Sequence, residues 1–408
     1  MDSASLSHPI SLASRLYLAR AVRDFGDGFV AVLLPVYLGV LGFDAIQIGL
    51  VATAALLGSA LMTIGVGLVG ARYGYRRLLM VASALMVLSG LALAAVNDYA
   101  LILVAAFAGT INPSAGSVSV FVPLEHAALS QSIEDKKRTQ AFARYSLIGA
   151  LAAAAGSLMA ASPDLLAGVG VERLAALKAM FVLYAVLGLA GGLLYAGLPA
   201  LTASEGPPPA PLGPSRRIVY RLAALFSVDA FAGGFVVQSL LALWLFDRFG
   251  MSLTGAGLFF FWSGVLAAFS FPVAAWLARR IGLVNTMVFT HIPSSLFLIA
   301  AAVAPTIEIA LACLLLRAAL SQMDVPTRSS YVMAVVTPPE RAAAASVTAV
   351  PRSLAAALSP ALAGALYSVG LQAWPLILCG ALKIAYDVAL LWAFRHVRPP
   401  EEQGAVPR

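Results

Sequence analysis

Charged residues and cysteines are both scarce in this sequence of 408 residues. Only 11% of the residues are charged against 61% hydrophobic, which is a membrane composition. The two cysteines, Cys313 and Cys379, fall in apolar segments and are expected to be packing residues rather than a disulfide or a metal pair. The sequence also lacks the HExxH, GxSxG and GxxxxGK[ST] motifs of zinc hydrolases, serine hydrolases and nucleotide-driven pumps. We therefore expect no enzyme, no cofactor and no metal site.

Long apolar runs bounded by charge or by Gly and Pro occupy most of the chain. A hydrocarbon core of ~30 Å needs ~20 apolar residues in a helix, so the runs predict an all-α integral membrane protein with twelve spans. The predicted spans are Leu16–Leu41, Ile46–Val69, Leu78–Val96, Tyr99–Val122, Tyr145–Ala161, Leu174–Leu198, Val219–Leu245, Leu253–Leu277, Val284–Ala304, Ile307–Val325, Ala342–Val369 and Trp374–Phe394.

The distribution of Lys and Arg predicts the orientation, because cations are retained on the cytoplasmic side of a membrane. With a cytoplasmic N-terminus, only Arg173, Lys178 and Arg248 fall on the outer side. We expect a multi-pass protein of the bacterial inner membrane with both termini in the cytoplasm. The bias accounts for the net charge of +7 without a nucleic-acid partner. No signal peptide is apparent, since the first apolar run is too long and contains four charges.

A proline-rich stretch near the chain midpoint, LTASEGPPPAPLGPSRR, divides the chain. It predicts a six-helix bundle at residues 1–200, a cytoplasmic linker at 201–217 and a second bundle at 218–408. One constant offset also superposes equivalent residues of the two parts. The superposed pairs are Gly42 and Gly250, Gly49 and Gly257, Arg72 and Arg280, Gly74 and Gly282, Arg144 and Arg352, and Gly156 and Gly364. This indicates two pseudo-symmetric six-helix bundles around a central cavity.

The loop between the second and third predicted spans reads Gly67-Leu-Val-Gly-Ala71-Arg72-Tyr-Gly74-Tyr75-Arg76-Arg77. It resembles the signature loop of the major facilitator superfamily, G-x-x-x-D-R-x-G-R-R. The residues that match are Gly67, Arg72, Gly74 and Arg76, and Arg77 adds a further cation beside them. The resemblance implies a secondary transporter of twelve helices with no enzymatic activity.

Ala71 stands where the family has the Asp that helps to lock the outward-facing state. The resemblance therefore implies that this interaction is absent or that another acid supplies it, and Glu125, at the cytoplasmic end of the fourth span, is the candidate substitute. The alternative interpretation is that the arginines of the loop only anchor it in the headgroup layer.

Charged residues inside the first predicted span are candidates for function, because each costs at least ~2.5–3.5 kcal/mol at the bilayer centre. Arg20, Arg23, Asp24 and Asp27 form one polar stripe, in which Arg20 can pair with Asp24 and Arg23 with Asp27 at i, i+4. Asp27 lies near the midplane and is predicted to couple protons or bind substrate. The alternative is that all four form neutralised pairs of a cytoplasmic gate.

The tenth predicted span carries a second stripe. Arg317 is central and is predicted to bind an anionic substrate group or to pair with a carboxylate across the cavity. Asp324 and Arg328, nearer the cytoplasm, are predicted gate residues, as are Arg144 and Arg352.

Further candidates lie in the fourth and seventh spans. Asp229 is at half depth, and Gln238 lines the same cavity only if the helix breaks near Gly233-Gly234. Asn112, before Pro113, predicts a kink with a polar lining residue, or alternatively an Asn that only satisfies local backbone. In the peripheral helices, His291 is expected to be structural, and Lys383 and Asp387 to form a self-neutralised pair at i, i+4.

These patterns predict secondary active transport by alternating access, with proton-coupled efflux of a small, partly apolar molecule as the leading hypothesis. The aromatic run Phe259–Trp262 suits such a substrate. One alternative is proton-coupled uptake of an organic acid or sugar, with Arg317 clamping a carboxylate. Another is a non-transporting membrane receptor or scaffold. The expected partners are a small-molecule substrate, a proton or other coupling ion and the lipid bilayer, and the protein is expected to be a monomer.

Overall fold

The computed structural model describes residues 11–115, 119–133, 135–199 and 211–397, and this part of the chain is helical without strands. The helices of the N half are α1 (Leu12–Val40), α2 (Ala45–Tyr73), α3 (Tyr75–Ala95), α4 (Tyr99–Ala108), α5 (Phe121–Ser132), α6 (Asp135–Leu158), α7 (Ser162–Gly168) and α8 (Arg173–Ala196). Those of the C half are α9 (Arg216–Gly234), α10 (Gln238–Phe249), α11 (Leu253–Ile281), α12 (Leu283–Ala302), α13 (Ile307–Ser321), α14 (Asp324–Val335), α15 (Arg341–Ser368) and α16 (Trp374–Phe394).

Twelve membrane crossings account for these helices. Among the described residues, ten helical segments are long and apolar enough to span a bilayer by themselves. The eleventh crossing is α1, which carries too many charges to qualify on composition. The twelfth is made of the short apolar α4 together with α5. The predicted twelve-helix, all-α membrane architecture is confirmed.

Three of the twelve crossings are interrupted, at the fourth, seventh and tenth positions. The fourth breaks between Ala108 and Phe121, where Pro113 removes a backbone donor. The seventh breaks after Gly234, at the predicted glycine pair, and the tenth breaks at Gln322 and Met323. The predicted spans Tyr99–Val122, Val219–Leu245 and Ile307–Val325 are therefore each divided between two helices, because hydropathy records depth in the membrane and not helix continuity.

Glycines at equivalent turns support the internal repeat. Gly42 and Gly250 have φ of 89° and 61°, and Gly74 and Gly282 have φ of 72° and 86°. These are left-handed conformations that residues with a Cβ rarely adopt. The offset read from the sequence thus places two backbone turns of one half on two turns of the other.

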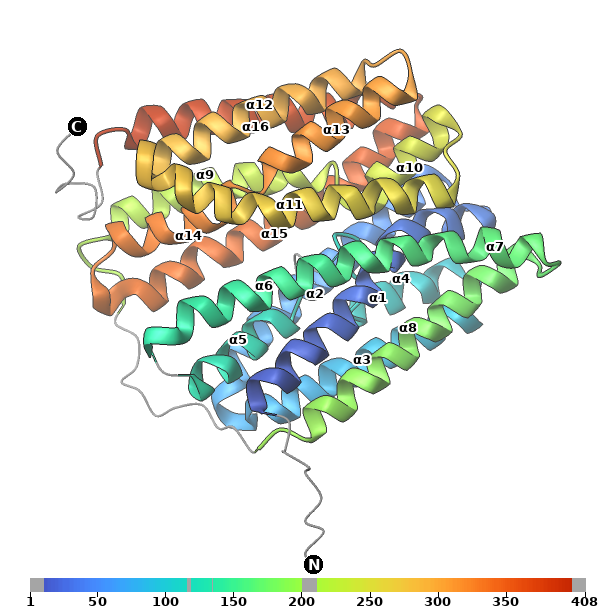
Figure 1. Cartoon of the computed structure of the whole chain (residues 1–408), viewed down its shortest axis with the longest axis horizontal. Coiled ribbons are helices and arrows are strands. Elements are labelled where there is room, and N and C mark those ends of the chain that lie inside the picture. The colour runs from blue at the N-terminus through green and yellow to red at the C-terminus, as the bar shows by residue number, and fades with distance from the viewer. Residues whose placement is uncertain (1–10, 116–118, 134, 200–210, 398–408) are drawn as a thin grey trace, which may run out of the picture.

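The two halves touch each other at one end of the molecule. We call the end that carries the start of α1, the end of α16 and the residues flanking the linker the linker end, and the opposite end the far end. Figure 1 shows the halves side by side, with the start of α1 and the end of α16 at the linker end. At the far end, α2 packs on α15 and α6 packs on α11. The amide of Ala361 donates to Thr53 Oγ1 at 3.0 Å across this contact.

Close backbone approach makes this contact possible. A Cβ on Gly49 would lie 2.5 Å from the carbonyl oxygen of Pro360, and a Cβ on Gly257 would lie 2.6 Å from that of Ser157. Gly49 and Gly257 are one of the superposed pairs, so in each half a glycine at an equivalent position allows close packing against the other half at the far end.

Candidate functional site

Five charged side chains of the N half form one buried cluster, which we call the N-half cluster: Arg20, Arg23, Asp24, Asp27 and Glu125. Arg20 Nε lies 2.6 Å from Asp24 Oδ2, which confirms the predicted i, i+4 pair. Arg23 Nη1 lies 3.0 Å from Asp24 Oδ1 and 3.6 Å from Asp27 Oδ2. Its Nη2 lies 3.1 Å from Glu125 Oε2. Arg23 therefore joins three acids rather than pairing with Asp27 alone.

Three tyrosines complete this cluster. Tyr145 and Tyr195 both donate to Glu125, Tyr195 at 2.6 Å, and Tyr184 donates to Asp27 Oδ1 at 3.1 Å. Glu125, whose surface is fully buried, is held by these two hydroxyls and Arg23. The sequence pattern missed the tyrosines, because they come from α6 and α8, far from α1 in the chain.

The acids of the N-half cluster outnumber its cations, with three carboxylates against two guanidinium groups. Asp27 has the longest ion-pair contact, and it is 1% exposed. A carboxylate in this setting can be neutralised by one proton without breaking the shorter Arg23 contacts.

A second buried network, the C-half cluster, consists of Asp229, His291, Asp324, Arg328, Lys383 and Asp387. Arg328 Nη1 lies 2.9 Å from Asp229 Oδ2 and 3.1 Å from Asp324 Oδ2. Lys383 Nζ lies 2.5 Å from Asp229 Oδ1. Asp229 thus receives cations from two helices, α14 and α16.

The predicted self-neutralised pair of Lys383 and Asp387 is wrong. Lys383 pairs with Asp229, and Asp387 pairs with His291, whose Nδ1 lies 3.1 Å from both carboxylate oxygens. The i, i+4 rule considers one helix by itself, and here partners on α9 and α12 are closer. His291, expected to be structural, is the residue that connects Asp387 to Lys383.

Two half-buried cations of the C half have no ion pair within the described part of the chain. Arg317 is half-buried, and its backbone oxygen accepts from Ser294 while its guanidinium has no carboxylate partner there. Arg352 is also half-buried, close enough to Arg328 and Asp229 for their charges to act on it. The predicted pairing of Arg317 with a carboxylate across the cavity is not formed.

The interrupted helices bring a set of neutral polar groups to the boundary of the two halves. The amide of Ser239 donates to the carbonyl oxygen of Pro113 at 3.1 Å, which joins the break in the seventh crossing to that in the fourth. Asn112 Oδ1 accepts from the amide of Ser114 at 2.9 Å, so part of its role is local. Within the described residues, Gln238 Nε2 and Thr110 Oγ1 are buried and have no hydrogen-bond partner.

The remaining predicted residues lie nearer the linker end. Gly74 forms the turn before α3. Gly67 is exposed, and a Cβ added to it would have no atom within 4 Å. The side chain of Arg76 is half-buried and that of Arg77 is exposed. Arg144 is exposed on α6. The side chain of Arg72 lies outside the described residues, so the role of Glu125 as its substitute acid stays a prediction.

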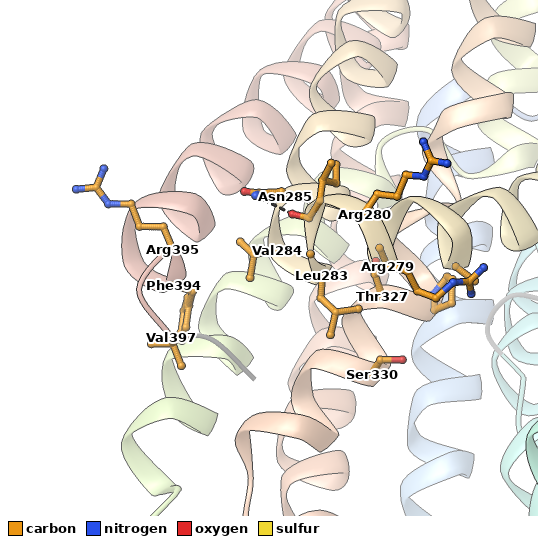
Figure 2. A pocket seen from close by; sticks show the side chains of 15 residues that line it. Arg279, Arg280, Leu283, Val284, Asn285, Thr327, Ser330, Phe394, Arg395 and Val397 are labelled. Atoms are coloured by element: carbon orange, nitrogen blue, oxygen red, sulfur yellow. Dashed lines mark hydrogen bonds between the residues drawn. The ribbon is translucent and has the colours of Figure 1, made fainter. Parts of the chain in front are cut away.

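A hollow of about 700 Å³ opens at the linker end of the C half. It is lined by the end of α11, the start of α12, residues of α14 and the segment after α16. Figure 2 shows Arg279 and Arg280 on one side of it, with Arg395 extending away from them. It holds none of the predicted site residues and lies apart from the two clusters.

Comparison with known families identifies the chain. The family model described as Major Facilitator Superfamily matches residues 16–316 and 222–408. This chain belongs to the major facilitator superfamily. As a member of this superfamily it is a membrane transporter and not an enzyme.

A curated relative and several solved structures resemble this superfamily member. An uncharacterized membrane protein of Saccharomyces cerevisiae, YJR124C, is 24% identical over 94% of each chain. A bacterial homolog of the human lysosomal transporter Spinster, solved in an inward-facing and unoccupied conformation, has a TM-score of 0.74 at 15% identity, covering 98% of this chain and all of the other. The nucleoside transporter NupG scores 0.72 at 15% identity over 95% and 100% of the chains. The human organic anion transporter MFSD10 scores 0.65 at 17% identity over 93% and 99%.

Proposed function

We propose that this protein is a proton-coupled secondary transporter of a small organic anion that works by alternating access. The observation that carries the proposal is the opposite surplus of buried charge in the two halves. The N-half cluster has one carboxylate more than it has cations. In the C half, the three buried acids are Asp229, Asp324 and Asp387, and the buried or half-buried cations are four, namely Arg317, Arg328, Arg352 and Lys383.

The surplus carboxylate of the N-half cluster is the proposed proton-binding site. Asp27 is the member of the N-half cluster with the weakest ion pair, and Tyr184 is its hydrogen-bond donor. A proton on Asp27 makes the N-half cluster neutral, which lowers the free-energy cost of moving these side chains through an apolar environment.

The surplus cation of the C half is the proposed binding site of the substrate anion. Arg317 is half-buried at a membrane depth where an unpaired charge is costly, and a carboxylate or phosphate of the substrate would be its counter-ion. The likeness to the organic anion transporter MFSD10 supports the same class of substrate. The unsatisfied amide of Gln238 is suited to a neutral polar group of the same molecule.

We infer further that the structure represents an inward-facing state with a cytoplasmic linker end. The contacts between the halves close the far end, and loop arginines gather at the linker end, as expected for the cytoplasmic side. The similar Spinster homolog is also inward-facing and unoccupied, which supports this assignment. The divisions at residues 1–200, 201–217 and 218–408 and a bacterial inner-membrane location belong to the same proposal.

Efflux of a partly apolar molecule stays a prediction. Its support from the aromatic run is reduced, since Phe259 and Phe260 are buried in the core while Trp262 is 51% exposed. The charge surplus favours the anion instead.

The test is anion flux into proteoliposomes with an imposed pH gradient, using labelled mono- and dicarboxylates. We expect gradient-driven flux in the wild type. Arg317→Gln should raise KM for the anion about tenfold or more, because a charge-assisted contact is lost. Asp27→Asn should leave anion exchange intact and remove the acceleration by the gradient.

The matched controls are Arg279→Gln and Asp247→Asn, which change exposed residues of the same types and should behave as wild type. Wild-type flux that is indifferent to the gradient would refute proton coupling. An unchanged KM in Arg317→Gln would refute the anion site.

A further inference from the structure

His291 lies at the centre of a chain of contacts between two helices of the C half. Its Nδ1 faces Asp387 at 3.1 Å, and its Nε2 lies 3.4 Å from Lys383 Nζ. One neutral tautomer satisfies both contacts: Nδ1–H donates to Asp387, and the lone pair on Nε2 accepts from the ammonium group. The ammonium group also donates to Asp229.

A second proton on His291 is incompatible with this arrangement. It would occupy Nε2, remove the acceptor used by Lys383 and place two cationic donors against each other. Asp229 Oδ1 is 3.9 Å from Nε2 and is the nearest carboxylate that the new donor can reach. The imidazolium therefore competes with Lys383 for the same oxygen atom.

We propose that His291 is a proton-operated release for the Lys383–Asp229 ion pair, and thereby a second proton site of the transport cycle. The inference rests on the proposed proton coupling and adds a residue outside the N-half cluster. One proton enters and no covalent bond changes: His291 becomes cationic, turns its Nε2–H to Asp229, and Lys383 loses that partner.

The surrounding charges allow this exchange. The ionisable groups on helices around His291 include Lys383, Tyr386, Asp387 and Cys379 of α16, Asp229 of α9, Asp324 and Arg328 of α14, Arg317 and Cys313 of α13, Arg352 of α15, and Arg279 and Arg280 of α11. Asp387 remains beside the imidazolium after the exchange and offsets its charge. Arg328 continues to hold Asp229 through Oδ2, so the carboxylate stays in place.

The released ion pair borders the break in the seventh crossing. Lys383 lies against Gly233, where a Cβ would be 3.9 Å from its Nζ. The next residue, Gly234, packs on Ala356 and Ser359 of α15, and Ser359 donates to the carbonyl of Phe231 at 2.5 Å. Helix α15 is also the helix that contacts α2 at the far end. Loosening Lys383 thus frees the end of α9, and α15 connects that end to the closed contact between the halves.

The test measures distances between spin labels on the full-length protein in lipid nanodiscs without substrate. Labels are attached at Gln140→Cys and Ser329→Cys, exposed positions at the linker ends of the two halves, in a Cys313→Ala, Cys379→Ala background. Between pH 8 and pH 5 we expect the short-distance population to rise about tenfold relative to the long one, the effect of one charge-assisted hydrogen bond. His291→Gln should abolish this response.

Two further variants decide between a specific and a structural effect. His126→Gln changes a half-buried histidine of the N half, which packs on Phe142 and Tyr145, and should respond to pH as wild type does. Lys383→Met should show at pH 8 the distribution that the wild type shows at pH 5. A pH response retained in His291→Gln, or a wild-type-like Lys383→Met at pH 8, would overturn the proposal.

The outcome is separable from that of the proposed function. Gradient-driven anion flux together with label distances that ignore pH would refute only the role of His291. Label distances that respond through His291, in a protein whose flux ignores the gradient, would refute proton-coupled anion transport and the place of His291 in its cycle, and would leave only the proton-operated release of the ion pair.

Discussion

At the residue scale, Glu340 shows how one carboxylate fixes a loop outside the membrane. It lies in η2 (Pro338–Glu340), between α14 and α15, and accepts from the amides of Gly213 and Ser215 before α9. Thr337 Oγ1 donates to it at 2.5 Å. Hydrogen bonds from Ser215, Thr337 and Gly213 lower the pKa of Glu340 from 4.5 to about 2.

The lowered pKa predicts how this attachment depends on pH. Because the carboxylate is favoured in the folded state, its contribution is fully present above the unfolded value near 4.5 and is lost as the pH falls through about 2. Glu340→Ala should reduce hydrogen-exchange protection of the Gly213 and Ser215 amides about tenfold at neutral pH. Glu172→Ala, which removes an exposed acid without a side-chain cap, should leave it unchanged. Equal protection in both variants would contradict the role of Glu340.

The ion pairs show which site residues a sequence can predict. The Arg20–Asp24 pair was predictable because both partners share one helix turn of α1. The network of Asp229, Lys383 and His291 was not, since three helices distant in sequence supply it. Depth within a span identified Asp27, Asp229 and Arg317 as candidates, and their roles stay proposals. The sequence offered no sign of the tyrosines that hold Glu125, because tyrosine is common in membrane helices.

At the element scale, glycine decides how closely helices of the two halves can approach. Gly49 of α2 and Gly364 of α15 face each other, and a Cβ on either would meet the backbone of the other helix. Gly65, on the same helix as Gly49, has nothing within 4 Å of an added Cβ. Substituting Gly49 and Gly65 in parallel therefore separates the effect of packing between helices from the effect of helix propensity.

Gly49→Ala should weaken the far-end contact and shift the protein toward the state that is closed at the linker end. The reason is a Cβ placed 2.5 Å from the carbonyl oxygen of Pro360. The same label pair at Gln140 and Ser329 should show a gain of about tenfold or more in the short distance, from an overpacking cost of ~1–3 kcal/mol. Gly65→Ala is the control and should keep the wild-type distribution. A long distance preserved in Gly49→Ala would show that the contact does not hold the state.

The ends of a helix were predictable where they coincide with the ends of an apolar run in the sequence. The last span, Trp374–Phe394, agrees at both ends, and the first differs by a few residues. The interruptions of the fourth and seventh crossings were signalled by Pro113 and by the glycine pair. The break at Gln322 and Met323 precedes Pro326, which has no N–H to donate to the carbonyl of Gln322, but the predicted span ended at Val325 and so did not include this proline.

At the scale of the whole molecule, the asymmetry of basic loops predicts sidedness. Loop arginines crowd the linker end, so that end should face the cytoplasm. Val169→Cys, in the exposed far-end turn after α7, should react with a membrane-impermeant maleimide in intact cells. Ser330→Cys, exposed at the linker end, should react at least about tenfold more slowly until the membrane is opened. Both cysteines are placed in the background without native cysteines. Labelling with the reverse preference would invert the orientation.

Helix α1 is made before the residues of other helices that contact its charged side chains. Arg23 meets Glu125 across 102 positions and Asp27 meets Tyr184 across 157. At insertion each ionised side chain costs ~2.5–3.5 kcal/mol at the helix centre. Assembly in the cell must therefore retain the first segment at the translocon, or shelter it there, until α5 and α8 have been synthesised. The residues that equip the N half for transport thus also delay the release of its first helix into the lipid until its later helices have been made.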